Sequence, residues 1–151
     1  MPGRSGGAFE LALAGADADA IRLLTRHGWK VRDALELSRD IMPYRDYIRG
    51  SRSEFTVAKD QNVRLRSGWF SDRSACYLAA GRPVITQDTG FGGVLPTGEG
   101  LFAFKTMDEI LSAVEAVTSN YPRHAHAARA IAEAYFRAET VLAKLLDDLG
   151  P

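Results

Sequence analysis

The chain has 151 residues and a mass of 16.5 kDa, and its 19 Lys and Arg residues balance 19 Asp and Glu residues. This length predicts one domain with its own hydrophobic core. Zero net charge excludes a protein whose main task is to coat nucleic acid. A single cysteine, Cys76, excludes a disulfide framework and a multi-cysteine zinc site. No signal-peptide pattern or apolar run of ~20 residues is present, so we expect a cytoplasmic protein without a membrane span.

The charge is unevenly distributed along the chain. Residues 44–73 hold seven basic and four acidic residues, a net charge of +3. Residues 108–151 hold four basic and seven acidic residues, a net charge of −3. This asymmetry favours an anionic ligand in the middle of the chain.

The first fifty residues predict strands that alternate with helices. Asp17 is a typical helix N-cap, and Gly28 stands where a helix ends in the left-handed conformation. In chain order we expect a strand over 9–14, a helix from 17 to 28, a strand over 29–34 and a short helix from Pro43 to Gly50.

The rest of the chain continues the alternation and ends in helices. Thr106 and Glu109 form a capping-box pattern for the first of these helices. We expect a strand over 54–59, a polar loop over 60–68, a helix from 71 to 81, a strand over 83–86, a glycine-rich loop to residue 100, a strand over 101–104, and helices over 106–151 that bend near 137–140. Residues 1–7 are expected to form a flexible terminus.

This alternation predicts an α/β fold with a Rossmann-like, doubly wound parallel sheet. Such sheets bind ligands at the carboxyl ends of their strands. Here those ends lie near Gly15, Ala34, Lys59, residues 88–93 and Lys105.

The first candidate site is the start of the helix after residue 70. Hydroxyl groups, a guanidinium and free backbone N–H groups at a helix start suit a diphosphate. The residues concerned are Ser71, Asp72, Arg73 and Ser74, with Lys59 on the preceding loop. The alternative is a helix cap at Ser71 or Asp72 with Arg73 in a surface ion pair.

The second candidate is the loop after the strand over 83–86. Thr89, Gly90, Phe91 and Gly92 begin it, and glycines there permit close backbone approach to a ligand. Glu99, further along, has an acceptor for sugar hydroxyls. The alternative is a plain turn with an exposed glutamate.

Three other residue types give no catalytic pattern. The histidines His27, His124 and His126 lack metal-ligand spacing. Cys76 is expected to pack in the core. A tryptophan is more often a core or interface residue than a stacking platform, although Trp69 adjoins the first candidate site.

From Trp69 to Gly100 the sequence resembles the donor-binding half of GT-B glycosyltransferases of the group-1 type. In that family a Glu-Gly-Phe-Gly segment, a helix, a Gly-x-Pro-Val unit and a glycine-rich turn follow one another. Phe70, Ala79, Gly81, Pro83 and Val84 match it in order. The turn at Thr89-Gly90 and the segment Gly98-Glu-Gly-Leu101 continue the match.

The resemblance implies binding of a nucleotide-sugar donor and glycosyl transfer from it. Gly68 and Cys76 stand where the family has paired glutamates, so that donor contact does not carry over. Arg73 matches an arginine of a subgroup resembling spore-coat maturation glycosyltransferases, which implies a phosphate contact. The nucleotide, the sugar, the acceptor and the stereochemical outcome stay open.

Length sets a further expectation, because a complete GT-B enzyme has two Rossmann-like halves. We expect one donor-binding domain over residues 1–151, no N-terminal acceptor domain, and little activity without that domain or a partner subunit. No metal or other cofactor is expected. The alternative function is a non-catalytic nucleotide-binding, phosphate-binding or interaction module that keeps the fold.

Overall fold

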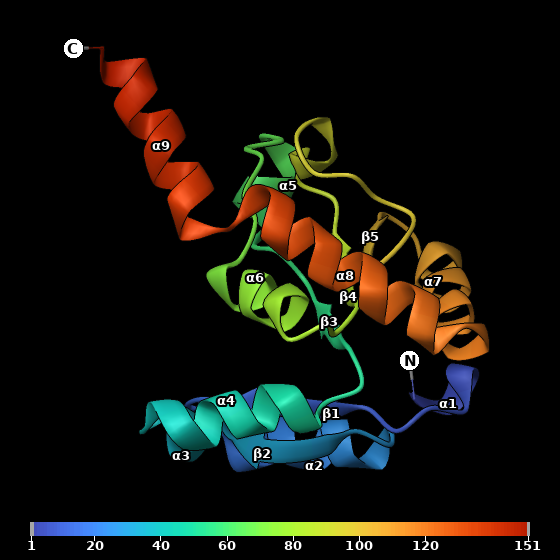
Figure 1. Cartoon of the computed structure of the whole chain (residues 1–151). Coiled ribbons are helices and arrows are strands. Elements are labelled where there is room, and N and C mark those ends of the chain that lie inside the picture. Colours follow the sequence, from blue (N-terminus) through green and yellow to red (C-terminus); the bar gives the residue numbers. More distant parts are fainter. Residues whose placement is uncertain (1, 151) are drawn as a thin grey trace. The chain divides into compact units, whose positions relative to one another are not determined.

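The structure is a computed structural model that describes residues 2–150 (Figure 1). The chain divides into two compact units, Met1–Gly50 and Ser51–Pro151. Each unit has a small parallel sheet and helices, so the mixed α/β class is confirmed. The finer expectations, a doubly wound GT-B half and a single domain over 1–151, stay predictions, and Met1 and Pro151 lie outside the described residues.

The first unit contains a two-stranded parallel sheet in which Glu10 lies opposite Lys30. Its helix α2 begins where Asp17 Oδ1 accepts a hydrogen bond from Ala20 N at 2.7 Å, as the sequence predicts. Its elements are α1 (Pro2–Ser5), β1 (Glu10–Leu13), α2 (Ala18–Arg26), β2 (Lys30–Asp33), α3 (Ala34–Ser38) and α4 (Ile41–Gly50). The helix α1 lies within the terminus that was expected to be flexible.

Burial in the first unit is slight. Among residues 2–50, Ile48 alone is buried. Phe9 and Trp29 lie edge to face with ring centroids 5.5 Å apart. A unit of this size has too little interior for a large core, and most of its side chains are exposed or half-buried.

The second unit contains a three-stranded parallel sheet in the order β3-β4-β5. Val84 of the central strand lies opposite Glu54 on one side and Leu101 on the other. Its elements are β3 (Glu54–Thr56), α5 (Asp60–Arg64), α6 (Asp72–Ala79), β4 (Val84–Gln87), the 3-10 turn η1 (Phe91–Gly93), β5 (Leu101–Phe104), α7 (Met107–Ser119), α8 (Tyr121–Tyr135) and α9 (Ala138–Leu149).

The core of the second unit lies on the central strand β4. Val84, Ile85 and Thr86 are all buried, as expected for a strand that is covered on both faces. The helix α6 packs on α8, while α7 contacts β4 and β5. Leu78 and Leu101 are also fully buried in this core. Figure 1 shows α9 extending away from the sheet of this unit.

Most predicted boundaries are close to those observed. The capping box at Thr106 and Glu109 is present, and the helical tail breaks between Tyr135 and Ala138. The strand expected over 54–59 ends at Thr56. The stretch expected to be a polar loop contains α5, a short helix with no buried residue. Since such a helix has no apolar stripe, hydrophobic periodicity could not reveal it.

The expectation that Cys76 packs in the core is wrong. The buried residues of α6 are Ser74, Tyr77 and Leu78, and Cys76 is exposed on another face. Partial burial, followed by the nearby carboxylates of Asp72 and Glu54, raises the pKa of the Cys76 thiol. The thiol is therefore protonated at neutral pH, which argues against a role as nucleophile.

Close packing of β5 on α8 depends on Gly100. This residue has a φ of +72°, and a Cβ added to it would lie 2.3 Å from the backbone nitrogen of Ala128. We expect Gly100→Ala to lower the free energy of unfolding by about 3 kcal/mol, through overpacking and left-handed strain together. Urea unfolding measures the change.

Gly98→Ala is the matched control for that substitution. Gly98 also has a positive φ, +107°, but a Cβ there would meet nothing within 4 Å. Its cost should be the strain alone, about 1–2 kcal/mol. Equal losses in the two variants would contradict the packing argument.

Candidate functional site

The carboxyl ends of β3, β4 and β5 gather polar residues at one edge of the sheet. Lys59, residues 88–93 and Lys105 follow the three strands in turn. The helix α6 begins at this edge, because the segment before it is bonded to the loop after β4. Gly68 N donates to Thr89 O at 2.9 Å, and Thr89 Oγ1 donates to Trp69 O at 2.6 Å. We call this side of the second unit the carboxyl edge.

A carboxylate between two cations lies at the centre of the carboxyl edge. Asp88 Oδ1 accepts a hydrogen bond from Gly90 N at 2.8 Å. Its Oδ2 lies 3.4 Å from Arg66 Nη1 and 3.3 Å from Lys105 Nζ. The side chain of Asp88 is only 11% exposed, whereas both cations are largely exposed. We call Arg66, Asp88 and Lys105 the edge cluster.

These contacts keep Asp88 ionised. The backbone N–H of Gly90, and then the positive charges of Lys105 and Arg66, hold the pKa of the Asp88 carboxyl below its ordinary value. The cluster therefore carries two positive charges and one negative charge at neutral pH.

Lys59 adds a further positive charge close to the edge cluster. Gln87 Oε1, at the end of β4, accepts a hydrogen bond from Ala58 N at 3.3 Å, which brings the residue before Lys59 to this edge. Within residues 2–150, Lys59 takes part in no ion pair. Lys59, Arg66 and Lys105 thus outnumber the carboxylates of Asp88 and of the exposed Asp72 at the carboxyl edge.

The two loops at the carboxyl edge press closely together. Arg66 is a non-glycine residue with a φ of +47°, in the left-handed region. A Cβ added to Gly90, whose φ is +97°, would lie 3.2 Å from Arg66 O. Unfavourable backbone conformations persist only where surrounding contacts enforce them, and they often mark binding sites. The loop contacts therefore fix the main chain that carries Arg66.

Arg73 lies at the start of α6, but its guanidinium is bonded to β3. Arg73 Nε donates to Glu54 Oε1 at 2.6 Å, and its Nη2 donates to Thr56 Oγ1 at 2.8 Å. Glu54 is only 5% exposed, and within the described part of the chain its Oε2 has no hydrogen-bond partner. The ion pair therefore neutralises a carboxylate that would otherwise be buried without a counter-charge.

The other polar groups at the start of α6 form hydrogen bonds with neighbouring residues or are buried. Ser71 is the N-cap by position, and its Oγ lies 3.4 Å from Asp72 Oδ1. The same Asp72 oxygen accepts a hydrogen bond from Arg73 N at 2.8 Å. Ser74 is fully buried. The structure thus brings Ser71 to Ser74 to the carboxyl edge, although only Asp72 and Arg73 are exposed there.

The residues of the glycine-rich loop differ in their surroundings. Thr89 is fully buried, and its hydroxyl is bonded to Trp69. Phe91 is buried with its ring centroid 5.3 Å from that of Phe70. Gly92 is exposed, and Gly90 donates to Asp88. The backbone of this loop, and not its larger side chains, therefore faces the edge cluster.

Glu99 forms an ion pair with Arg123, and it takes part in none of the ion pairs of the edge cluster. The hydrogen bond from Arg123 lowers the pKa of the Glu99 carboxyl. His124 is buried, and its Nδ1 accepts a hydrogen bond from Gly100 N at 3.3 Å. Within residues 2–150, no group of three or more His, Cys, Asp or Glu side chains is placed to hold a metal ion.

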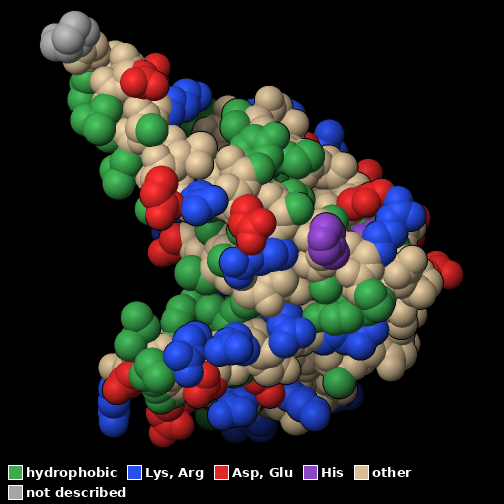
Figure 2. All heavy atoms as spheres, viewed as in Figure 1, with side chains coloured by type: hydrophobic (Ala, Val, Ile, Leu, Met, Phe, Trp, Pro, Cys, Tyr) green, Lys and Arg blue, Asp and Glu red, His purple; other side chains and the backbone are tan. Residues whose placement is uncertain are grey.

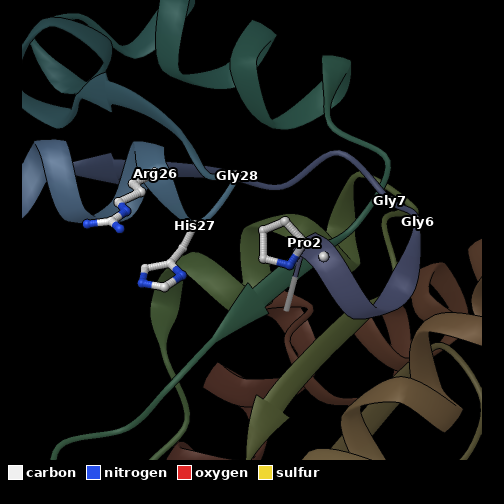
Figure 3. A pocket seen from close by; sticks show the side chains of 7 residues that line it. Pro2, Gly6, Gly7, Arg26, His27 and Gly28 are labelled. Atoms are coloured by element: carbon white, nitrogen blue, oxygen red, sulfur yellow. The ribbon is translucent and has the colours of Figure 1, made fainter.

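The first unit has a hollow that carries little chemistry. Figure 3 shows its lining, in which Arg26 and His27 are the two titratable side chains. The other lining residues are Pro2, Gly3, Gly6, Gly7 and Gly28. Arg26 and His27 are both exposed, so nothing in this hollow holds a ligand group in a fixed, desolvated position.

Sequence reasoning missed the edge cluster as a site. It recognised Lys59, residues 88–93 and Lys105 as strand ends, but it did not join Arg66, Asp88 and Lys105. The available signal was the occurrence of charged residues directly after consecutive parallel strands.

Comparisons with protein-family models, with curated proteins and with solved structures find no match to this chain. In the part of the chain that the structure describes, no helix has the length and apolar character to cross a membrane.

The ion pair between Arg73 and Glu54 predicts strong coupling in unfolding experiments. Arg73→Ala leaves Glu54 buried without its cation, so we expect a loss of about 2–4 kcal/mol in the free energy of unfolding. Adding Glu54→Gln should recover much of that loss, because the amide carries no charge to be desolvated. Urea unfolding of both single variants and the double variant gives the coupling energy between the two residues. Losses in the free energy of unfolding that simply add in the double variant would contradict the predicted coupling.

The lowered pKa of Asp88 predicts how stability depends on pH. The folded state favours the ionised carboxylate of Asp88, so this group contributes to the free energy of unfolding. The contribution is complete above the unfolded pKa of about 4, and it is lost as the pH falls through the lower pKa of the folded state. Urea unfolding between pH 3 and pH 7 should show a smaller acid loss in Asp88→Asn than in the parent. Glu99→Gln is the control, and its exposed ion pair should change the profile little.

Proposed function

We propose that the unit Ser51–Pro151 binds a nucleoside-diphosphate sugar at the carboxyl edge of its parallel sheet. The observation that carries this proposal is the exposed positive charge at Arg66, Lys105 and Lys59, which exceeds the negative charge of Asp88 and Asp72 at the same edge. Diphosphates favour sites where cations and free backbone N–H groups converge, and parallel α/β sheets bind ligands at this edge.

The proposed reaction is glycosyl transfer with the nucleoside diphosphate as leaving group. Negative charge grows on the diphosphate as the glycosidic bond breaks, and fixed cations stabilise that charge. Arg66 and Lys105 are held near each other by Asp88, so they are positioned before the ligand arrives. In the first turn of α6 the N–H of Arg73 is bonded to Asp72, so the neighbouring N–H groups of that turn are the additional donors.

Arg73 has a different part in this proposal from the one that the resemblance implies. Its guanidinium is bonded to Glu54 and Thr56, so we assign it to holding the start of α6 against β3. The diphosphate is assigned to Arg66, Lys105 and Lys59. Arg73 then acts on binding through the placement of α6.

The wider identity that we propose is the donor-binding half of a GT-B glycosyltransferase of the group-1 type, in the spore-coat maturation-like subgroup. The sequence match from Trp69 to Gly100 and the alternation of parallel strands with helices support it. Transfer then requires an acceptor wall on a further domain or partner subunit, so the chain by itself is proposed to bind donor without efficient turnover.

A second candidate is a nucleotide-binding module without transferase activity. It is favoured by the residues that stand in place of the family's paired glutamates, because neither Gly68 nor the protonated thiol of Cys76 can act as a carboxylate. Both candidates share the same diphosphate site. The two candidates differ in one respect: a domain with an acceptor-binding surface restores glycosyl transfer in the first and does not in the second.

Titration calorimetry with UDP, GDP, ADP and TDP tests the diphosphate site. Lys105→Ala and Arg66→Ala should each weaken binding by roughly tenfold, the effect of removing one charge-assisted contact. Affinity should also fall as salt rises. Lys144→Ala on α9 is the control, since it removes an exposed lysine from another element. Affinities in the first two variants that equal the parent's would contradict the assignment.

A further inference from the structure

Three exposed apolar side chains belong to the loops that carry the edge cluster. Leu65 is 75% exposed and Val94 is 74% exposed, while Trp69 is 38% exposed. Leu65 and Trp69 flank the loop that carries Arg66, and Val94 directly follows η1. Figure 2 shows hydrophobic side chains gathered over α5 and the turn after β4. We call Leu65, Trp69 and Val94 the apolar rim.

The main chain at Trp69 is held on both sides. Trp69 O accepts a hydrogen bond from Thr89 Oγ1 at 2.6 Å, and Trp69 N donates to Ser67 Oγ at 3.3 Å. The preceding residue, Gly68, is bonded to Thr89 O. The backbone that carries the indole is therefore fixed before any ligand binds.

The next residue anchors the same segment in the interior. The ring of Phe70 lies 5.3 Å from that of Phe91 and is stacked on Phe136, with centroids 5.6 Å apart. Phe70 thus takes the inward position, and Trp69 keeps a partly exposed ring beside it. Core packing accounts for Phe70 but does not account for a partly exposed indole on the loop that also carries Arg66.

We propose that Trp69 stacks on the base of the bound nucleotide, with Leu65 and Val94 on its flanks. This inference rests on the proposed function, since it names the part of the donor that the cations do not bind. A nucleoside diphosphate needs both a cationic site and a flat apolar surface. Arg66 and Trp69 supply the two within one loop, three residues apart.

Stacking on an aromatic ring tolerates every base, because each base has a π-face. The rim therefore discriminates nucleotides from base-free phosphates more strongly than it discriminates one base from another. Specificity for a particular base would require hydrogen-bonding groups in addition to the rim.

The test compares nucleoside diphosphates with inorganic pyrophosphate on the full chain. Trp29→Phe provides the background, because Trp29 and Trp69 are the two tryptophans in the sequence. In that background UDP or ADP should change the fluorescence of Trp69, while pyrophosphate should bind with little spectral change. Calorimetry in the same buffer supplies the dissociation constants.

Substitution of Trp69 then separates the base from the phosphates. Trp69→Ala should weaken UDP and ADP binding by at least about tenfold and leave pyrophosphate binding unchanged, whereas Trp69→Phe should keep most of the nucleotide affinity. Thermal melting of each variant checks that it is folded. If Trp69→Ala is unfolded, the comparison of Trp69→Phe with Trp69→Leu, which removes the ring but keeps apolar bulk, replaces it.

The outcomes distinguish this inference from the function on which it rests. Nucleotide affinity that is equal to pyrophosphate affinity in the parent, or that survives loss of the ring, overturns base stacking while the diphosphate site stands. Absence of binding for both pyrophosphate and the nucleotides overturns the diphosphate site and the stacking inference together.

Discussion

The site in the second unit depends on the burial of β4 between two parallel neighbours. Val84 and Ile85 are almost fully buried, and their register with β3 and β5 makes the three strands end together. Parallel pairing is what places residues from distant segments, such as Lys59 and Lys105, at a single edge. A shift of one residue in this register would turn buried side chains to the opposite faces, so the core also fixes the site's geometry.

Electrostatic order at that edge comes from a carboxylate placed among cations. Without Asp88, the positive charges of Arg66 and Lys105 would repel each other at the position where both are needed. Asp88 is itself held by the N–H of Gly90, so the loop after β4 links backbone conformation to side-chain charge. The cations stay largely exposed, which leaves them able to exchange part of this pairing for contacts with a stronger anion.

The elements with periodic apolar residues or a clear cap could be predicted from the sequence. The boundaries at Asp17, Thr106 and Leu101 are examples, since each is set by local chemistry. The helix α5 could not be predicted, because it is only five residues long and Val63 is its one apolar residue. The edge cluster also lay beyond sequence reasoning, since its contacts join residues 22 and 17 positions apart through tertiary packing.

Arg73 shows how a residue that a resemblance places in a binding site can have a structural task as well. An arginine at the start of α6 fits a phosphate contact by position, yet the nearest anion in this chain is the buried carboxylate of Glu54. Desolvation makes that carboxylate costly without its partner, whereas an exposed cation loses little when a ligand is absent. Selection for a stable contact between α6 and β3 would therefore retain arginine here whether or not a nucleotide binds. The exposed residues Arg66, Lys105 and Trp69 have weaker structural reasons to be present, so they are the more informative positions for identifying the ligand.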